Sequence, residues 1–359
     1  MMKSCKIVGL FCASVLVASP AFAFDGWHLD SATAIPGKTG SWDGLTVDAD
    51  GNRLFIGHRK QGLQVFDLAS NKVVKLIDKT ASGSSNGALL IPEFDLGIST
   101  NENGTITPFK LSTLNTIGEP IKLGNEADSS VYDPATKRIF VVLDGDKTGA
   151  DLAVVDAATL KMVGKVKLPS RKPQSLDVDE KGNLFVASRD MEAVHRVDTK
   201  TMKVTATWPA PGCGQTNGLA MDNGNKRIFL GCRGNAKVKP SFAVMNAETG
   251  KVVYTSEIGG GNDSVIYDAD LKRVFLGNGV GAVLNVFEQV NADTYKPVET
   301  LGTRQGMRSF AMHPKTKKIY AISAEGSADA SRKITTSVSP FYANTFFDNT
   351  FTVFTFTKK

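Results

Sequence analysis

The stretch Thr216-Asn217-Gly218-Leu219-Ala220-Met221-Asp222 decides the fold, because its pattern recurs along the chain. A polar residue and a small residue precede a short apolar run, an acidic turn follows, and a second apolar run comes after the turn. Trp42-Asp43-Gly44-Leu45-Thr46-Val47-Asp48 is another clear copy. Successive copies lie 43, 43, 45, 43, 46 and 45 residues apart, which predicts seven copies of one structural unit. The small residue of each copy stands at Gly44, Gly87, Ser130, Ser175, Gly218, Ser264 and Ser309.

Each copy is expected to form four short strands. In the first copy these strands cover residues 45–47, 53–57, 63–67 and 72–77, because short β-branched and aromatic runs alternate there with Gly, Asn and Asp. No stretch shows a convincing period of about 3.6 residues, so helix should be scarce. Four strands in a repeat of about 40–45 residues are typical of a β-propeller. The predicted fold class is therefore all-β, a seven-bladed β-propeller with four-stranded blades.

The two ends of the repeated region predict how the ring closes. The last copy ends with a third strand at residues 351–356 and has no fourth. An unassigned strand at residues 28–35 precedes the first full copy. We expect this N-terminal strand to complete the last blade, which would also cover an exposed sheet edge.

The first 23 residues are predicted to be a signal peptide. Lys3 and Lys6 precede an apolar stretch at residues 7–18, and Ala21-Phe22-Ala23 has the small-x-small pattern of a cleavage site. Residues 24–359 would then form a single propeller domain, exported to the periplasm or secreted. No later apolar stretch approaches the roughly 20 residues of a membrane span. We expect a monomer.

Composition and charge narrow the classes of protein. Hydrophobic residues make up 42% and charged residues 22%, which excludes wholesale disorder. The formal net charge is +6, and removing Lys3 and Lys6 with the signal peptide leaves +4. A mildly basic charge permits an anionic ligand and does not by itself indicate nucleic acid.

Two cysteines, Cys213 and Cys232, remain after Cys5 and Cys12 leave with the signal peptide. Cysteines in an oxidising compartment usually pair, so we expect a disulfide, with two free buried thiols as the alternative. The repeat places the pair beside Arg233 at one mouth of the channel, away from the core. There the bridge would shape a loop rather than perform redox chemistry, for which a Cys-x-x-Cys spacing is more usual.

Polar side chains gather where a ligand site would form. In a propeller the start of each first strand and the end of each second strand meet at one channel mouth. The predicted ligand-binding residues are Asp43, His58, Arg59, Asn86, Asp128, Arg189, Asn217, Arg233, Asp263 and Arg308. Equivalent positions in other blades add Asn101, Asp144, Gln174, Asp190, Asn278 and Glu325.

The four arginines of this set carry the functional interpretation. They come from four different blades, and their guanidinium forks fit a carboxylate or a phosphate. The acids and amides have an alternative explanation, since Asp and Asn satisfy turn backbones and a channel mouth is filled with water. The last copy also carries about 20 additional residues, at 324–344, which could form a lid or a mobile surface loop.

Several segments resemble a known repeat family. Residues 218–222, 227–231 and 153–159 look like the YVTN-type, YncE-like propeller repeat, and the resemblance covers nearly all of the mature chain. It implies an exported propeller and leaves the activity open.

The leading hypothesis is a non-catalytic propeller without a resident cofactor, which binds an anionic small molecule or a protein partner at the mouth. One alternative is a metal-dependent hydrolase, similar to lactonase-type propellers that hold calcium with oxygen ligands and are usually six-bladed. Single-stranded nucleic-acid binding is a second alternative, weakened by the absence of an aromatic stacking platform. The residues that could imitate the calcium ligands are Asn86, Asn217, Asp263 and Asp128.

Overall fold

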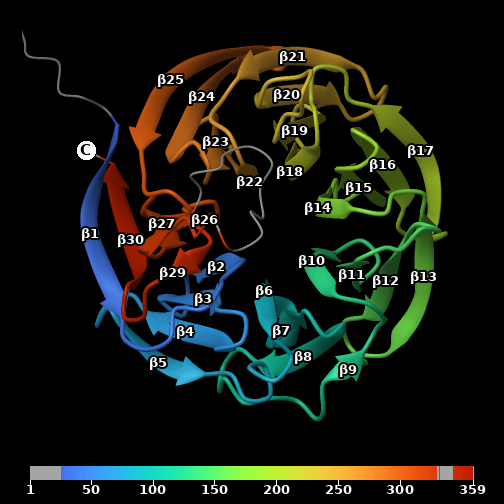
Figure 1. Cartoon of the computed structure of the whole chain (residues 1–359). Helices are drawn as coiled ribbons and strands as arrows, with labels where there is room; N and C mark the ends of the chain where they lie inside the picture. The colour runs from blue at the N-terminus through green and yellow to red at the C-terminus, as the bar shows by residue number, and fades with distance from the viewer. Residues whose placement is uncertain (1–25, 330, 332–342, 359) are drawn as a thin grey trace, which may run out of the picture.

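Seven four-stranded antiparallel sheets surround a central channel in the computed structural model (Figure 1). The structure describes residues 26–329, 331 and 343–358, so the predicted signal peptide lies outside the described residues. Within that part of the chain, the 3-10 turn η1 (Pro92–Phe94) is the only helical segment. No described helix has the length and apolar character needed to cross a membrane. The predicted seven-bladed, all-β propeller is confirmed.

The blades follow the sequence repeat and are numbered 1 to 7, each beginning with its innermost strand. Blade 1 contains β2 (Leu45–Asp48), β3 (Arg53–Gly57), β4 (Leu63–Asp67) and β5 (Lys72–Leu76). Blade 2 contains β6 (Ser85–Ile91), β7 (Leu96–Asn101), β8 (Thr105–Lys110) and β9 (Ile121–Lys122). Blade 3 contains β10 (Ala127–Asp133), β11 (Arg138–Leu143), β12 (Ala150–Asp156) and β13 (Met162–Leu168). Blade 4 contains β14 (Pro173–Val178), β15 (Asn183–Ser188), β16 (Ala193–Asp198) and β17 (Lys203–Pro209).

The remaining blades continue the same order until the chain ends. Blade 5 contains β18 (Thr216–Asp222), β19 (Arg227–Cys232), β20 (Ser241–Asn246) and β21 (Val252–Glu257). Blade 6 contains β22 (Asn262–Asp268), β23 (Arg273–Asn278), β24 (Val283–Asn291) and β25 (Thr294–Gly302). Blade 7 contains β26 (Phe310–Met312), β27 (Ile319–Ser323), β30 (Phe351–Lys358) and, from the other end of the chain, β1 (Trp27–Ile35). A separate hairpin is formed by β28 (Gly326–Ser327) and β29 (Thr345–Phe346).

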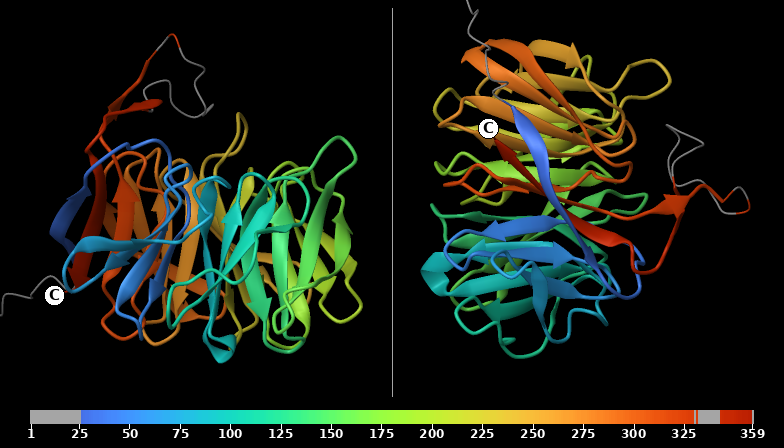
Figure 2. Two further views of the ribbon diagram at one scale, coloured as in Figure 1. Left: turned by 90° about the horizontal axis from the view of Figure 1, so that it is seen from below. Right: turned by 90° about the vertical axis from the view of Figure 1, so that its left-hand side faces the viewer.

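Blade 7 closes the ring as the sequence predicts. Strand β1 pairs antiparallel with β30, from Trp27 opposite Lys358 to Ile35 opposite Phe351, and the two strands lie side by side at the rim (Figures 1 and 2). We call the junction of β1 and β30 the seam. Trp27 anchors it because its ring is buried against Phe275, at 5.1 Å between centroids. Its indole N–H donates to the carbonyl of Lys317 at 3.0 Å. The N-terminal strand therefore completes the last blade.

The core lies between neighbouring blades. The third residue of the second strand is a fully buried phenylalanine in five blades, and clusters such as that of Phe140 with Leu176 and Val186 join one blade to the next. Burying each such side chain stabilises the fold by about 1.5–3 kcal/mol. The five phenylalanines are Phe55, Phe140, Phe185, Phe229 and Phe275.

The small residue of each repeat allows the innermost strands of neighbouring blades to pack closely near the channel axis. Gly44 donates its backbone N–H to the carbonyl of Asn86 at 2.6 Å, so the innermost strands of blades 1 and 2 nearly touch. A Cβ atom on Gly87 would lie 3.2 Å from the Cα of Gly44, and one on Gly57 would lie 2.4 Å from the carbonyl oxygen of Asn86. Larger side chains at these positions would push the two strands apart.

Candidate functional site

A polar cavity of about 220 Å³ occupies the mouth where first strands begin and second strands end. Eight of the ten predicted ligand-binding residues line it, and the structure thus brings most of the set together. Every lining residue is polar or charged, so no aromatic side chain offers a stacking surface inside the cavity. The eight residues are Asp43, Arg59, Asp128, Arg189, Asn217, Arg233, Asp263 and Arg308.

The charges of the cavity are distributed unevenly around the ring. Blade 3 supplies Glu126, Asp128 and Asp144, which we call the acidic sector. Blades 4, 5 and 7 supply three arginines, which we call the arginine sector. Blade 6 places Asp263 among these arginines. The arginine sector comprises Arg189, Arg233 and Arg308.

Two members of the arginine sector are neutralised by Asp263. Arg233 makes an ion pair with this carboxylate, and the Arg308 guanidinium lies 3.0 Å from its other oxygen. Burial opposes ionisation of Asp263, yet the charges of Arg308, Arg233 and Arg189 hold its pKa well below the usual range. Asp263 is therefore ionised at neutral pH and pairs with Arg233 and Arg308.

Arg59 is also paired. Its guanidinium lies 2.5 Å from Asp43 and makes a second ion pair with Glu102, an acid that the sequence prediction did not include. Burial works against the charged form, but the attraction of Asp43 and Glu102 raises the pKa of Arg59 above its usual value. Two carboxylates thus occupy the charged end of this side chain.

Arg189 differs from the other arginines because its partners are amides. It donates to the side-chain oxygens of Gln174 and Asn217, the latter at 3.0 Å from Nε. No carboxylate of a described residue lies within ion-pair distance of it, and its Nη1 makes no hydrogen bond to a described residue. Burial and the repulsion of Arg233 lower the pKa of Arg189 to about 10. It stays cationic at neutral pH without a direct counter-charge.

Asp128 is the acidic counterpart of Arg189. Its side chain makes no hydrogen bond or ion pair to any residue in the described ranges, although it remains partly accessible to the channel. Burial first, and then the charges of Asp43 and Glu126, raise the pKa of Asp128 to about 7. Burial and the charge of Asp144 also raise the pKa of Glu126. Among the described residues, neither Asp128 nor Glu126 has a cation within ion-pair distance.

Lys172 and Asp144 form an ion pair at the rim, with Nζ 2.5 Å from the carboxylate. The sequence analysis missed Glu126 and Lys172 as candidates. Each stands two residues before a predicted site position, Asp128 and Gln174 respectively. Alternation along an extended chain places residues i and i+2 on the same side, and that signal could have found both.

His58 and Asn86 lie outside the cavity, contrary to the prediction. The His58 ring is buried, stacks on Phe351 at 4.0 Å between centroids and contacts the carbonyl of Thr39 at 2.5 Å. Burial lowers its pKa, so it is a neutral packing residue. Asn86 is buried and donates to the carbonyl of Ala127 at 2.9 Å, which links blades 2 and 3.

The residues proposed as calcium ligands are not grouped as a metal site. Asn86 is turned into the interface between blades, and Asp263 is held by two arginines. Among the residues that the structure describes, no group of three or more His, Cys, Asp or Glu side chains could hold a metal ion.

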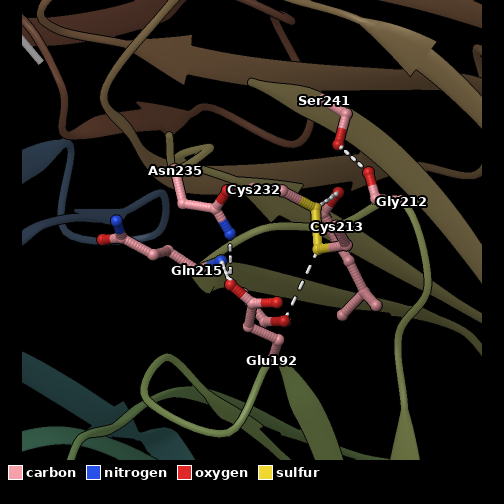
Figure 3. Close-up of a disulfide and its surroundings, with 9 residues drawn as sticks. Glu192, Gly212, Cys213, Gln215, Cys232, Asn235 and Ser241 are labelled. Carbon is pink, nitrogen blue, oxygen red and sulfur yellow. Dashed lines mark hydrogen bonds between the residues drawn. A yellow bond between two sulfur atoms is a disulfide. The ribbon is translucent and has the colours of Figure 1, made fainter. Parts of the chain in front are cut away.

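The disulfide between Cys213 and Cys232 is present, as the sequence predicts (Figure 3). Its expected position away from the core is wrong, because both cysteines are buried in the apolar cluster between blades 4 and 5. Cys232 ends β19 and Arg233 follows directly, so the bridge fixes the backbone that presents this arginine. Nearby, Glu192 accepts hydrogen bonds from the backbone of Gln215 and the side chain of Asn235 (Figure 3).

The additional segment of blade 7 contains the hairpin β28–β29, which stands out from the ring (Figure 2). Because it follows the end of the second strand β27, it lies on the side where the cavity opens. The side chain of Gln305 accepts a hydrogen bond from the backbone of Ala343 at 3.3 Å and ties the base of the segment to the ring. Residues 330 and 332–342 lie outside the described residues, so the lid stays a prediction.

Solved structures with similar folds have very different sequences. The RRP9 WD40 repeats are 10% identical with a TM-score of 0.71, covering 90% of this chain and 96% of that chain. Hydrazine synthase of Kuenenia stuttgartiensis is 14% identical with a TM-score of 0.69, covering 80% of this chain and 94% of that one. A chain of a mitotic checkpoint complex is 13% identical with a TM-score of 0.68, covering 89% and 96%.

Identities this low show a shared fold and nothing finer. No protein-family model matches the sequence, and no curated protein matches it. The fold and the site together define a WD40-like, seven-bladed propeller with a charged polar cavity at one mouth of its channel.

Proposed function

We propose that this chain is an exported binding protein of the YVTN-type, YncE-like propeller class, which holds a small molecule with an anionic group in the channel mouth. The propeller supplies a rigid ring, and six of its seven blades bring side chains from distant parts of the sequence into one cavity. Loops at such positions commonly carry function because the scaffold holds them in place.

Arg189 is the observation that carries this proposal. It lines the cavity, has amide partners only and keeps a hydrogen-bond donor unused toward the described residues. A guanidinium that is half-buried without a counter-charge can gain a charge-assisted, bidentate interaction from a bound carboxylate or phosphate. The three other arginines have carboxylate partners already.

Export is supported by the chemistry of the cysteines. A disulfide persists in an oxidising compartment and is rare in the cytosol, and the bridge of blade 5 is of this kind. The charged and apolar pattern of residues 1–23 points in the same direction. Fusion of residues 1–23 to a periplasm-dependent reporter such as alkaline phosphatase would test it, and reporter activity equal to that of a leaderless fusion would contradict export.

The binding site is tested with Arg189→Gln in protein purified from the periplasm. Native mass spectrometry of the wild type identifies co-purified organic anions, and calorimetry then measures their affinity. We expect Arg189→Gln to weaken binding by at least about tenfold. Arg171→Gln is the matched control, because Arg171 is an exposed arginine of the same blade that does not line the cavity. Equal affinity in the two variants would place the site elsewhere.

A protein partner at the same mouth is a second candidate. The hairpin β28–β29 stands out on that face, and Phe347 beside it is 49% exposed. One of the similar propellers belongs to a mitotic checkpoint complex, which shows that the fold occurs in protein assemblies. Phe347→Ser should abolish co-purification of such a partner without changing small-molecule affinity. Retention of the partner by Phe347→Ser would contradict this candidate.

A further inference from the structure

We propose that the ligand is a small zwitterion, with its carboxylate bound by Arg189 and its ammonium group bound by Asp128. This inference rests on the proposed function, since it assigns the anionic group to Arg189 and adds a second charge to the same molecule. Both side chains line the same cavity, one from the arginine sector and one from the acidic sector.

The balance of charge in the cavity supports a ligand without net charge. Five basic and five acidic side chains line it, so their formal charges cancel. A monoanion would be attracted at Arg189 but repelled by the acidic sector of the neighbouring blade 3. A monocation would experience the reverse. A zwitterion can orient each of its charges toward the sector of opposite sign.

The pairing of the other side chains singles out Arg189 and Asp128. Asp263 neutralises two arginines, Asp43 pairs with Arg59, and Lys172 pairs with Asp144. Arg189, Asp128 and Glu126 are left without an ionic partner among the described residues. Glu126 still accepts a hydrogen bond from the side chain of Asn86 at 3.4 Å, whereas Asp128 makes none. Buried charges are costly unless they are paired, so Arg189 and Asp128 gain most from opposite charges that a ligand brings.

The walls of the cavity favour a small hydrophilic molecule. Its volume is about 220 Å³, and the lining residues expose only polar groups. Gln174, Ser175 and Asn217 offer amide and hydroxyl groups next to Arg189. An aliphatic amino acid satisfies these conditions because its charged ends dominate a short apolar chain.

The pH dependence separates a zwitterion from a simple anion. Asp128 faces Asp43, Glu126, Asp263, Arg59 and Arg189, with the Lys172–Asp144 pair just beyond the ends of the neighbouring strands β14 and β11. A bound ammonium group favours the carboxylate form of Asp128, so zwitterion binding should strengthen by about tenfold between about pH 6 and 8. A monoanion disfavours that form and should bind more weakly over the same range. Arg189 remains protonated throughout.

The experiment uses unbranched amino acids of increasing chain length, each with its own matched acid and amine. Glycine, β-alanine, γ-aminobutyrate and ε-aminocaproate vary the separation of the two charges. The carboxylic acid and the amine of the same chain length accompany each probe. Calorimetry measures each affinity at both pH values on wild-type protein, on Asp128→Asn and on the control Asp151→Asn, whose carboxylate lies outside the cavity.

We expect one amino acid to bind at least about tenfold more tightly than its acid and its amine, and to lose this advantage in Asp128→Asn. Thermal denaturation verifies that the variant is folded. If the acid binds as tightly as the amino acid and still requires Arg189, the zwitterion inference is overturned while the proposed function stands. If the amine alone accounts for binding, or no probe binds at millimolar concentration, the zwitterion inference is overturned, and the affinity of Arg189→Gln for the co-purified anion then decides the proposed function separately.

Discussion

The seam of the ring and the mouth of its channel differ in how well their buried polar groups are paired. At the seam, Trp27 buries its ring against Phe275, and its backbone N–H finds the carboxylate of Glu299 at 3.1 Å. The Arg273 guanidinium lies 5.5 Å above the same indole. At the mouth, by contrast, Asp128 has no ionic or hydrogen-bonded partner among the described residues, and Arg189 has only amides. The polar groups of Trp27 at the seam have partners, whereas the charged groups of Asp128 and Arg189 at the mouth have no partner of opposite charge within ion-pair distance.

The difference indicates that the seam contributes to the stability of the fold, whereas the mouth provides the groups that can bind a ligand. An unpaired charge in a half-buried position costs free energy of folding, and folding alone would not select for it. Such costs concentrate at functional sites because a ligand can relieve them. Substitutions at the seam should therefore destabilise the protein, whereas some substitutions at the mouth should stabilise it.

The largest effect is expected at the seam. Trp27→Ala should lower the free energy of unfolding by about 3–5 kcal/mol, because it leaves a large cavity and removes the donor to the Lys317 carbonyl. Chemical denaturation measures the change. Leu29→Ala is the matched control on the same strand, since Leu29 is 51% exposed. Equal losses in both variants would mean that the ring is not held at Trp27.

The opposite sign is expected at the mouth for Asp128→Asn. The pKa of Asp128 is about 7 in the folded protein and about 3.9 in an unfolded chain. The folded wild type therefore binds an extra proton between these values and loses stability as the pH rises through about 4 to 7. Above about pH 7 the variant should be more stable by up to about 4 kcal/mol, an upper limit because the channel admits water.

Denaturation curves of the wild type and Asp128→Asn at several pH values provide the measurement. The two stabilities should coincide below about pH 4 and separate progressively toward neutral pH. Parallel curves at a constant offset would show that the acid is not strained by its neighbours, and the contrast between seam and mouth would then be lost.

The disulfide combines features of both regions, because it is buried in the core and carries Arg233 next to its second cysteine. Its cysteines are 19 residues apart in sequence, so loop closure alone predicts a stabilisation of about 3 kcal/mol. Cys213→Ala and the double variant with Cys232→Ala should lose similar amounts, since either change removes the cross-link. Reduction of the wild type without a shift of its denaturation midpoint would contradict this.

The blades and the ring closure were predictable because both follow from local periodicity. A repeat of nearly constant length specifies one supersecondary unit, and the missing last strand could come only from the unassigned N-terminal segment. Convergence on the mouth was predictable for a similar reason, since antiparallel neighbours return to the same side. This reasoning placed Arg189 and Arg233, from different blades, beside each other, and both line the cavity.

The direction and pairing of the side chains could not be predicted from the sequence. His58 and Arg59 are neighbours in the chain, yet only Arg59 lines the cavity, because the ring of His58 packs on Phe351 from the far end of the chain. Which arginine remains unpaired depends on distances between blades. Asp263 lies within reach of Arg233 and Arg308, whereas Asn217 stands between Asp263 and Arg189.

The smallest effect is expected for a charge at the mouth that already has a partner. Lys172 pairs with Asp144 at 2.5 Å, but its side chain is 49% exposed, and such ion pairs contribute about 0.2–1 kcal/mol. Lys172→Gln should change the free energy of unfolding by less than about 1 kcal/mol and ligand affinity by less than about threefold. Lys226→Gln is the control, because Lys226 has a similar exposure and pairs with Glu248 outside the cavity.

This last comparison decides whether the mouth works through its total charge or through its unpaired groups. If unpaired groups matter, Lys172→Gln should resemble Lys226→Gln in denaturation and calorimetry, while Arg189→Gln alone loses affinity. If Lys172→Gln weakens binding as strongly as Arg189→Gln, the summed potential of the mouth attracts the ligand instead. In that case the pairing of each charge would no longer explain which residues bind.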